Sequence, residues 1–231
     1  MSRRQNYVKH DSFNESAEMY LKTVSELAES GAPVPISALA DRLGVSPVSA
    51  TEMVHRLQGN GLLAHRPYKG ILLTDDGYRQ AADVIRNHRL WECFLVDHLG
   101  LPWDKVHDFA CRLEHASASQ VTDALDSFLG FPATCPHGNP ISPADERIGE
   151  AAHRSLAELH AGDKAAVVNI HPETGELLSY LYELGLVPGS RLAVLDVVPF
   201  GGPIVLNVEG EQRYLGQEAA AFVFIRKIED R

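Results

Sequence analysis

The dominant spacing of apolar residues changes near Lys164 in this chain of 231 residues. Upstream, apolar residues recur at every third or fourth position, which is the spacing of helices with one buried face. Downstream come short apolar runs separated by Gly and Pro turns: AAVVNI, RLAVLDVVP, PIVLNVEG and AAFVFIRKI. The sequence therefore predicts a mainly helical protein that ends in a small β-barrel-like domain.

Residues 36–74 show the pattern of a winged helix-turn-helix. A short helix ends at Gly44, and a second helix, capped by Ser46, precedes strands predicted over 62–65 and 70–74. In this fold the second helix enters the major groove of DNA and basic residues contact phosphates. The predicted DNA-binding residues are Ser46, Pro47, Val48, Ser49 and Glu52 on the helix, Arg66 and Lys69 in the wing, and Arg3 and Arg4 near the N-terminus.

The composition allows DNA binding without demanding it. The net charge is −10, but residues 1–70 have a net charge of +1, so the acidic excess lies further along the chain. None of the helix positions that would face bases is Arg or Asn, so DNA shape is expected to carry much of the specificity. A winged helix used for protein contacts remains an alternative.

The remaining composition favours a cytoplasmic protein. No apolar run approaches the roughly 18 residues of a membrane-spanning helix, and the N-terminal segment lacks the apolar region of a secretory signal. The three cysteines, at positions 93, 111 and 135, show no paired spacing, which favours reduced thiols over disulfides. Cys93 and Cys135 are not assigned as ligands.

The sharpest chemical pattern is the triplet Cys111, Glu114 and His115, within a helix predicted from Trp103 to about Leu129. The spacing i, i+3, i+4 places a thiolate, a carboxylate and an imidazole on one helix face, with His107 one turn earlier. Such a face suits a transition metal that takes its fourth ligand from elsewhere.

A second pair, His88 and Glu92, shares one face of a helix predicted from Gly77 to about Leu99. By itself such a pair is typical of a solvated helix surface. Two other functions stay open: a metal-dependent hydrolase with Glu114 as the base, and a metal-independent winged-helix regulator. The chain has no H-E-x-x-H motif, which argues against a zincin hydrolase.

Four motifs, AEMYL (17–21), HRLWE (88–92), KVHDFACRLEH (105–115) and HGNPI (137–141), resemble the diphtheria-toxin-repressor family of iron- and manganese-dependent regulators. The resemblance covers nearly the whole chain and includes the family's manganese-transport-regulator branch. It implies three domains: a winged helix-turn-helix over 1–75, a helical dimerisation and metal-binding domain over 76–145, and a linker helix (about 145–160) with an SH3-like domain over 146–231. The last domain is also similar to the barrel of ferrous-iron-transport accessory proteins.

The resemblance implies two metal sites per subunit. The primary site, whose occupancy switches DNA binding, matches Met19, Cys111, Glu114 and His115. Met19 lies off the apolar stripe of the first predicted helix, as a ligand would. The ancillary site matches His88, Glu92 and His107, and His171 and Glu173 are the candidates from the C-terminal domain.

The function implied is a repressor of metal homeostasis genes, with Mn(II) or Fe(II) as co-repressor. A cytoplasmic homodimer, joined through helices between about 76 and 130, would bind a palindromic DNA operator. No catalysis, no small organic substrate and no membrane partner are expected. The sulfur ligands favour iron over manganese but do not decide between them.

Overall fold

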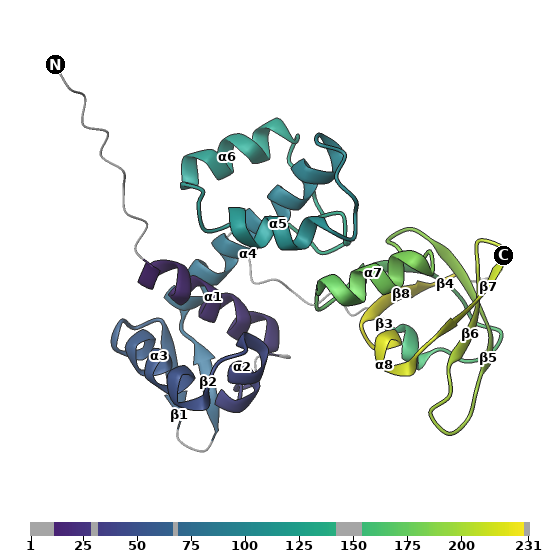
Figure 1. Ribbon diagram of the computed structural model, residues 1–231, viewed down its shortest axis with the longest axis horizontal. Coiled ribbons are helices and arrows are strands. Elements are labelled where there is room, and N and C mark those ends of the chain that lie inside the picture. Colours follow the sequence, from purple (N-terminus) through teal and green to yellow (C-terminus); the bar gives the residue numbers. More distant parts are fainter. Residues whose placement is uncertain (1–11, 29–31, 67–68, 142–153, 229–231) are drawn as a thin grey trace. The chain divides into compact units, whose positions relative to one another are not determined.

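The computed structural model describes residues 12–28, 32–66, 69–141 and 154–228 (Figure 1). The described chain divides into two compact units, one ending at Arg86 and one starting at Asn87. No helix in these ranges is both long and apolar enough to span a membrane.

The first unit is the predicted winged helix-turn-helix. It contains α1 (Ser12–Leu27), α2 (Ile36–Leu43), α3 (Pro47–Gly59), the antiparallel hairpin of β1 (Leu63–Arg66) and β2 (Gly70–Leu73), and the start of α4 (Asp75–Asp97). Its core consists of apolar side chains from all of these elements, including Leu21, Val24, Leu39, Val54, Leu57 and Ile71.

The turn between α2 and α3 follows from local sequence chemistry. Gly44 ends α2 in the left-handed region, at φ 66°, where a residue without Cβ is favoured. Ser46 begins α3 by accepting a hydrogen bond from the backbone N–H of Ser49 at 3.1 Å, and Pro47 occupies the first helical position. The predicted cap at Ser46 is confirmed.

The second unit begins within α4 and continues with α5 (Val106–Leu113) and α6 (Ser119–Phe128). The single helix predicted from Trp103 to Leu129 is therefore wrong. The chain leaves the helix after Glu114, and Ala118, with extended backbone at ψ 151°, starts α6 as its N-cap. The apolar spacing continues across this break, so periodicity alone could not show it.

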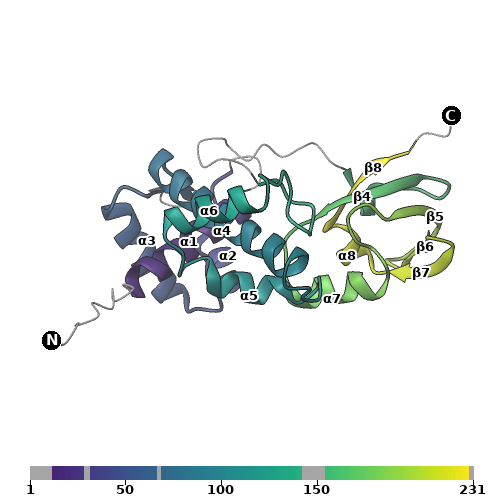
Figure 2. The ribbon, with the colours of Figure 1, turned by 90° about the horizontal axis from the view of Figure 1, so that it is seen from above.

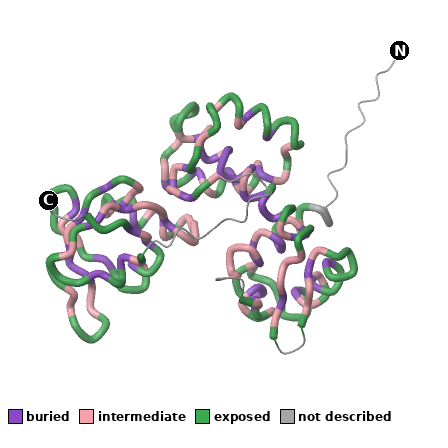
Figure 3. Tube along the Cα trace, turned by 180° about the vertical axis from the view of Figure 1, so that it is seen from behind, coloured by how far each residue is buried: buried purple, intermediate pink, exposed green. Residues whose placement is uncertain are grey.

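An antiparallel sheet follows, in the order β3-β8-β4-β5-β6-β7 (Figure 2). The strands are β3 (Arg154–Ser155), β4 (Lys164–Ile170), β5 (Arg191–Val197), β6 (Ile204–Val208), β7 (Glu211–Leu215) and β8 (Val223–Lys227), and the helices are α7 (Gly175–Glu183) and α8 (Gln217–Ala220). Buried residues lie along the strands, whereas the hairpin between β5 and β6 is exposed (Figure 3). The predicted fold class is confirmed.

Three details of the C-terminal region differ from the sequence prediction. In the described part of the linker helix expected over 145–160, Arg154 and Ser155 pair with β8, and Leu156–Glu158 form a 3-10 turn. Ser155 and Glu158 close a capping box around this turn, which buries Leu156 in the barrel core. Strand β7 was not predicted, and neither were helices α7 and α8.

Candidate metal centre

Helix α4 supplies the first two residues of the centre, His88 and Glu92. They lie one turn apart, with His88 Nε2 2.9 Å from Glu92 Oε1. Both side chains are buried, and Glu92 is wholly inaccessible to solvent. Buried charges of this kind are stable only when they are paired or bind a metal. The solvated-surface interpretation of this pair is therefore wrong.

Helix α5 adds His107 to the same group. Its Nδ1 lies 3.2 Å from His88 Nε2 and 3.5 Å from Glu92 Oε1. Its other ring nitrogen, Nε2, lies 3.6 Å from the Sγ of Cys111, one turn further along α5. The three residues that the sequence grouped as ancillary ligands therefore converge, and Cys111 lies at the edge of their group.

Glu173 completes this group from the C-terminal region, immediately before α7. Its Oε2 lies 3.6 Å from both His88 Nε2 and His107 Nδ1. One donor atom each from His88, Glu92, His107 and Glu173 lies within 4.8 Å of the others. His171, the other candidate from this domain, belongs to none of the donor groups found among the described residues.

A second group of donors, overlapping the first, comes from the loop that carries the motif CPHGN. One donor atom each from Glu92, Cys135, His137 and Glu173 lies within 4.8 Å of the others. Sequence reasoning left Cys135 and His137 out of the site. The available signal was a Cys and a His two positions apart, and this His is the first residue of the HGNPI motif.

Two buried atoms of this second group lack a hydrogen-bond partner among the described residues: Glu92 Oε2 and His137 Nδ1. The latter lies 3.1 Å from Glu92 Oε1, but the angles do not form a hydrogen bond. A polar atom buried without a partner costs about 1–3 kcal/mol, unless an ion or water satisfies it. Both atoms belong to residues of the same donor group, so the residues fit a bound divalent cation.

The loop is held over β4 by its own residues. Gly138 has φ 85°, and a Cβ there would stand 2.0 Å from the carbonyl oxygen of Val168. Asn139 donates to the carbonyl of Ile170 at 2.8 Å and also to the Glu173 carboxylate. The same loop residue therefore fixes both the loop and the carboxylate from the C-terminal region.

At the centre, the effect of neighbouring charges and hydrogen bonds on the pKa values is opposite to the effect of burial. Burial raises the pKa of Glu92, but the charges of His88 and His137 outweigh it and hold that pKa well below its usual range. Burial lowers the pKa of His107, but hydrogen bonds with Cys111, Glu173 and Glu92 raise it to about 11. Imidazolium protons thus balance the carboxylates, and metal binding would release these protons.

The predicted primary site divides between the two units. Glu114 and His115 lie together just after α5, with Glu114 Oε1 3.2 Å from His115 Nε2. Cys111 instead groups with His88 and His107. Met19 lies on α1 of the first unit and is 44% exposed, in agreement with its place off the apolar stripe. Its role as a ligand stays a prediction.

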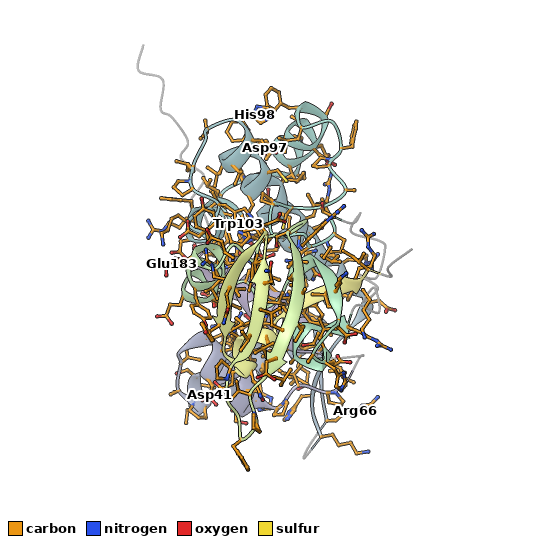
Figure 4. The ribbon with its side chains drawn as sticks, turned by 90° about the vertical axis from the view of Figure 1, so that its right-hand side faces the viewer. Asp41, Arg66, Asp97, His98, Trp103 and Glu183 are labelled. Carbon is orange, nitrogen blue, oxygen red and sulfur yellow. The ribbon has the colours of Figure 1, made fainter. Side chains whose placement is uncertain are left out.

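The predicted DNA-contacting residues lie at the surface of the first unit, which we call the head. All five helix positions, Ser46, Pro47, Val48, Ser49 and Glu52, are exposed, and Val48 is 69% exposed. Arg66 and Lys69 of the wing are exposed as well, and Arg66 is labelled in Figure 4. Arg3 and Arg4 lie outside the described residues.

Comparison with known proteins decides the family. Three family models match: iron dependent repressor, N-terminal DNA binding domain (residues 12–71); iron dependent repressor, metal binding and dimerisation domain (74–143); and FeoA domain (154–227). The iron-dependent repressor IdeR of Mycobacterium tuberculosis is 35% identical over 227 residues, which cover 93% of this chain and 98% of IdeR. The chain belongs to the iron-dependent repressor family. The predicted family resemblance is thereby confirmed.

Further relatives include a protein named for manganese. The diphtheria toxin repressor of Corynebacterium efficiens is 40% identical over 226 residues, covering 93% of this chain and 96% of that protein. A solved structure described as a manganese-dependent transcriptional repressor in complex with manganese is 36% identical, with a TM-score of 0.83, and covers 92% of this chain and 100% of its own. ScaR with bound Zn²⁺ is 33% identical, with a TM-score of 0.80, over 92% of this chain and 99% of its own.

Proposed function

We propose that this metal-dependent DNA-binding repressor responds to Mn(II) or Fe(II) through two sites. Occupancy of the primary site, formed by Met19, Cys111, Glu114 and His115, would switch DNA binding, and the buried centre around Glu92 would support that switch. The homodimer would bind a palindromic operator and repress metal homeostasis genes, without catalysing a reaction. The observation that carries the proposal is the pair of buried atoms without hydrogen-bond partners, Glu92 Oε2 and His137 Nδ1. Their residues belong to a set of nitrogen, oxygen and sulfur donors of the kinds that bind transition metals.

The ligands are assigned to two sites per subunit. The ancillary ligands are His88, Glu92, His107 and Glu173, extended by Cys135 and His137 of the overlapping group. The primary ligands remain Met19, Cys111, Glu114 and His115. A metal ion would supply positive charge that replaces the protons of the imidazoles beside the buried carboxylates.

The choice between the two metals follows from the donors. The two carboxylates and the histidines suit Mn(II) and Fe(II) alike, whereas the thiol of Cys135 favours the softer Fe(II). Relatives include proteins named for iron and for manganese. We therefore propose both metals as co-repressors, with selection by their cellular availability.

The proposed coupling between metal and DNA is reciprocal. A metal that raises the affinity for DNA tenfold to hundredfold requires a coupling free energy of only about 1.4–2.8 kcal/mol. DNA must then tighten metal binding by the same factor. The exposed face of α3 and the wing residues Arg66 and Lys69 would meet the operator, and these residues are the predicted DNA contacts.

The test is operator binding in the presence and absence of metal. DNA fragments selected from a random library would be titrated by fluorescence anisotropy, with chelated protein or with added Mn(II) or Fe(II). The double variant Glu92→Gln with His137→Asn replaces by neutral amides both side chains whose donor atoms lack a hydrogen-bond partner. We expect the wild type to gain at least about tenfold in affinity with metal, and the double variant to gain little.

Matched controls separate the function from stability. Glu183→Gln and His160→Asn make the same chemical changes at exposed positions of the second unit, so this double control should keep the full metal response. Equal DNA affinity with and without metal in the wild type would contradict the metal switch and favour a metal-independent regulator. Metal-dependent hydrolysis that is lost in Glu114→Gln would favour the hydrolase.

A further inference from the structure

Trp103, labelled in Figure 4, lies between α4 and α5 and contacts two different segments. Its indole Nε1 donates a hydrogen bond to the carbonyl of Pro136 at 2.8 Å. Its ring stacks on Tyr182 of α7, with ring centroids 5.9 Å apart and planes 21° apart. One side chain therefore holds the loop with Cys135 and His137 on one side and packs against α7 on the other.

The backbone of Trp103 also sets the proton arrangement of His137. The Nε2 of His137 lies 3.1 Å from the Trp103 carbonyl oxygen, which can only accept a hydrogen bond. This nitrogen must therefore keep its proton, so Nδ1 is the nitrogen that can exchange a proton for a metal ion. Nδ1 is also the atom that faces Glu92. An outer hydrogen bond of this kind orients a metal-ligating histidine.

The residues after Trp103 bind α7 as well. The hydroxyl of Ser179 donates to Asp104 Oδ2 at 2.9 Å, and the ammonium of Lys105 donates to the same hydroxyl at 2.8 Å. Helix α7 begins at Gly175, two residues after Glu173. The segment 103–105, which we name the docking turn, thus holds the helix that follows a carboxylate of the metal centre.

We infer that Trp103 is a positioning residue that makes metal binding and the seating of α7 depend on each other. The inference rests on the proposed function only in taking the centre around Glu92 as a metal site. Through Pro136 and the carbonyl bond to His137, Trp103 fixes the ligands of the loop. Through Tyr182, it fixes the helix next to Glu173. Ligands from two segments then meet only when the docking turn holds both.

The test uses the two tryptophans of the chain, Trp91 and Trp103. In the full-length variant Trp91→Phe, Trp103 is the sole indole and reports on its surroundings. Titration with Mn(II) alone should change its emission saturably, at the same concentration at which calorimetry detects binding. The reciprocal variant, Trp103→Phe, should bind Mn(II) about tenfold more weakly. This factor is the lower end of the range found when a residue that orients a metal ligand is lost. The emission of its remaining Trp91 should change little.

Tyr182 supplies a test that does not depend on a buried side chain. It is 52% exposed, so Tyr182→Ala should fold, lose the stacking and weaken Mn(II) binding. Tyr182→Phe keeps the ring and should restore the affinity. Tyr214→Ala is the matched control, because Tyr214 is 58% exposed on β7.

Hydrogen exchange gives a second readout of the same variants. Mn(II) should slow the exchange of α7 amides in the wild type and in Tyr182→Phe, but less in Tyr182→Ala. Wild-type Mn(II) affinity and protection in both Trp103→Phe and Tyr182→Ala would overturn the inference. That result would leave the metal dependence of wild-type DNA binding intact. If instead the proposed function fails, DNA binding would not depend on metal, but the fluorescence titration with Mn(II) would be unchanged.

Discussion

His88 is shared between the two sets of ligands that the sequence separated. Its Nε2 faces Glu92, His107 and Glu173, while its Nδ1 lies 2.5 Å from Glu114 Oε2. A carboxylate only accepts hydrogen bonds, so Nδ1 carries a proton and Nε2 is the nitrogen that can bind a metal. Glu114 thus orients a ligand of the ancillary site, and this hydrogen bond, together with the one between His107 and Cys111, joins the two predicted sites.

The three cysteines should differ in their reaction with iodoacetamide, which requires the thiolate. Burial and the charges of Asp97 and Glu92 raise the pKa of Cys93 to about 12, and burial raises that of Cys135 well above its usual value. Cys111 is only half-buried. At pH 8 we expect Cys111 to be alkylated first, as measured by mass spectrometry of peptides over time.

Denatured protein, in which all three thiols should react at similar rates, is the control for this experiment. If the sulfur of Cys111 is a ligand, bound Mn(II) should make the alkylation of Cys111 slower than in the metal-free protein. Alkylation of Cys93 as fast as that of Cys111 in the native protein would contradict the burial argument.

The sequence revealed the helical part of the metal centre and missed the part on the loop. His88 and Glu92 stand four positions apart on one helix, and a helix fixes such a pair by its own geometry. Cys135 and His137 lie on a loop without periodicity, and only tertiary folding brings them to Glu92. For the same reason spacing could not show that, of the two predicted ligands His171 and Glu173, only Glu173 belongs to a donor group among the described residues.

At the scale of elements, the loop with CPHGN depends on one glycine. Gly138→Ala would place a methyl group 2.0 Å from a backbone oxygen of β4, so the loop must move and take Cys135 and His137 with it. We expect at least about tenfold weaker Mn(II) binding by calorimetry, as for other losses of support to ligands.

Gly162→Ala is the matched control for that substitution. Gly162 also has a positive φ, 92°, but nothing lies within 4 Å of a Cβ built there. This variant carries the backbone strain of about 1–2 kcal/mol alone and should keep its metal affinity. Equal Mn(II) affinity in the two variants would show that the loop does not position ligands.

The N-cap of α3 should matter for the head alone. Ser46→Ala removes the acceptor for the Ser49 N–H, which costs about 1 kcal/mol of stability. Ser46→Asp keeps an acceptor and should restore most of this free energy, measured by urea unfolding of the full chain. Ser37→Ala changes an exposed serine in α2 and serves as control. A Ser46→Ala variant as stable as wild type would contradict the role of the cap.

Elements with a local signature were predictable, and elements fixed by tertiary contact were not. Capping by Ser46 and termination at Gly44 gave α2 and α3 correctly. The helix predicted over 145–160 fails because Arg154 and Ser155 pair with β8 and Leu156 is buried in the barrel core, and both are tertiary contacts. Helix α7 did carry a signal, since Leu178 and Leu181 share one buried face.

At the scale of the whole molecule, α4 connects the head to the metal centre through the chain itself. The helix starts in the first unit, directly after the wing, and its residues His88 and Glu92 follow the unit boundary at Arg86. Any displacement of these ligands therefore acts on the helix that begins at the wing. This continuity gives a covalent route for the proposed coupling between metal and DNA.

Removal of metal should therefore lower the stability of the second unit. Mn(II) at a hundred times its dissociation constant adds about 2.7 kcal/mol to the free energy of unfolding of the state that binds it. For a domain of this size, that free energy corresponds to roughly 5–10 °C in melting temperature. Calorimetric scans with Mn(II), and after treatment with a chelator, measure the shift.

The same scans can assign the stabilisation to the centre. Glu92→Gln with His137→Asn should reduce the shift to what the primary site alone contributes, because the two donors without hydrogen-bond partners are replaced. Glu183→Gln with His160→Asn should keep it, since both of these side chains are exposed. If the ion bound elsewhere, both double variants would shift like the wild type, and the link from the buried donors to the stability of the unit would fail.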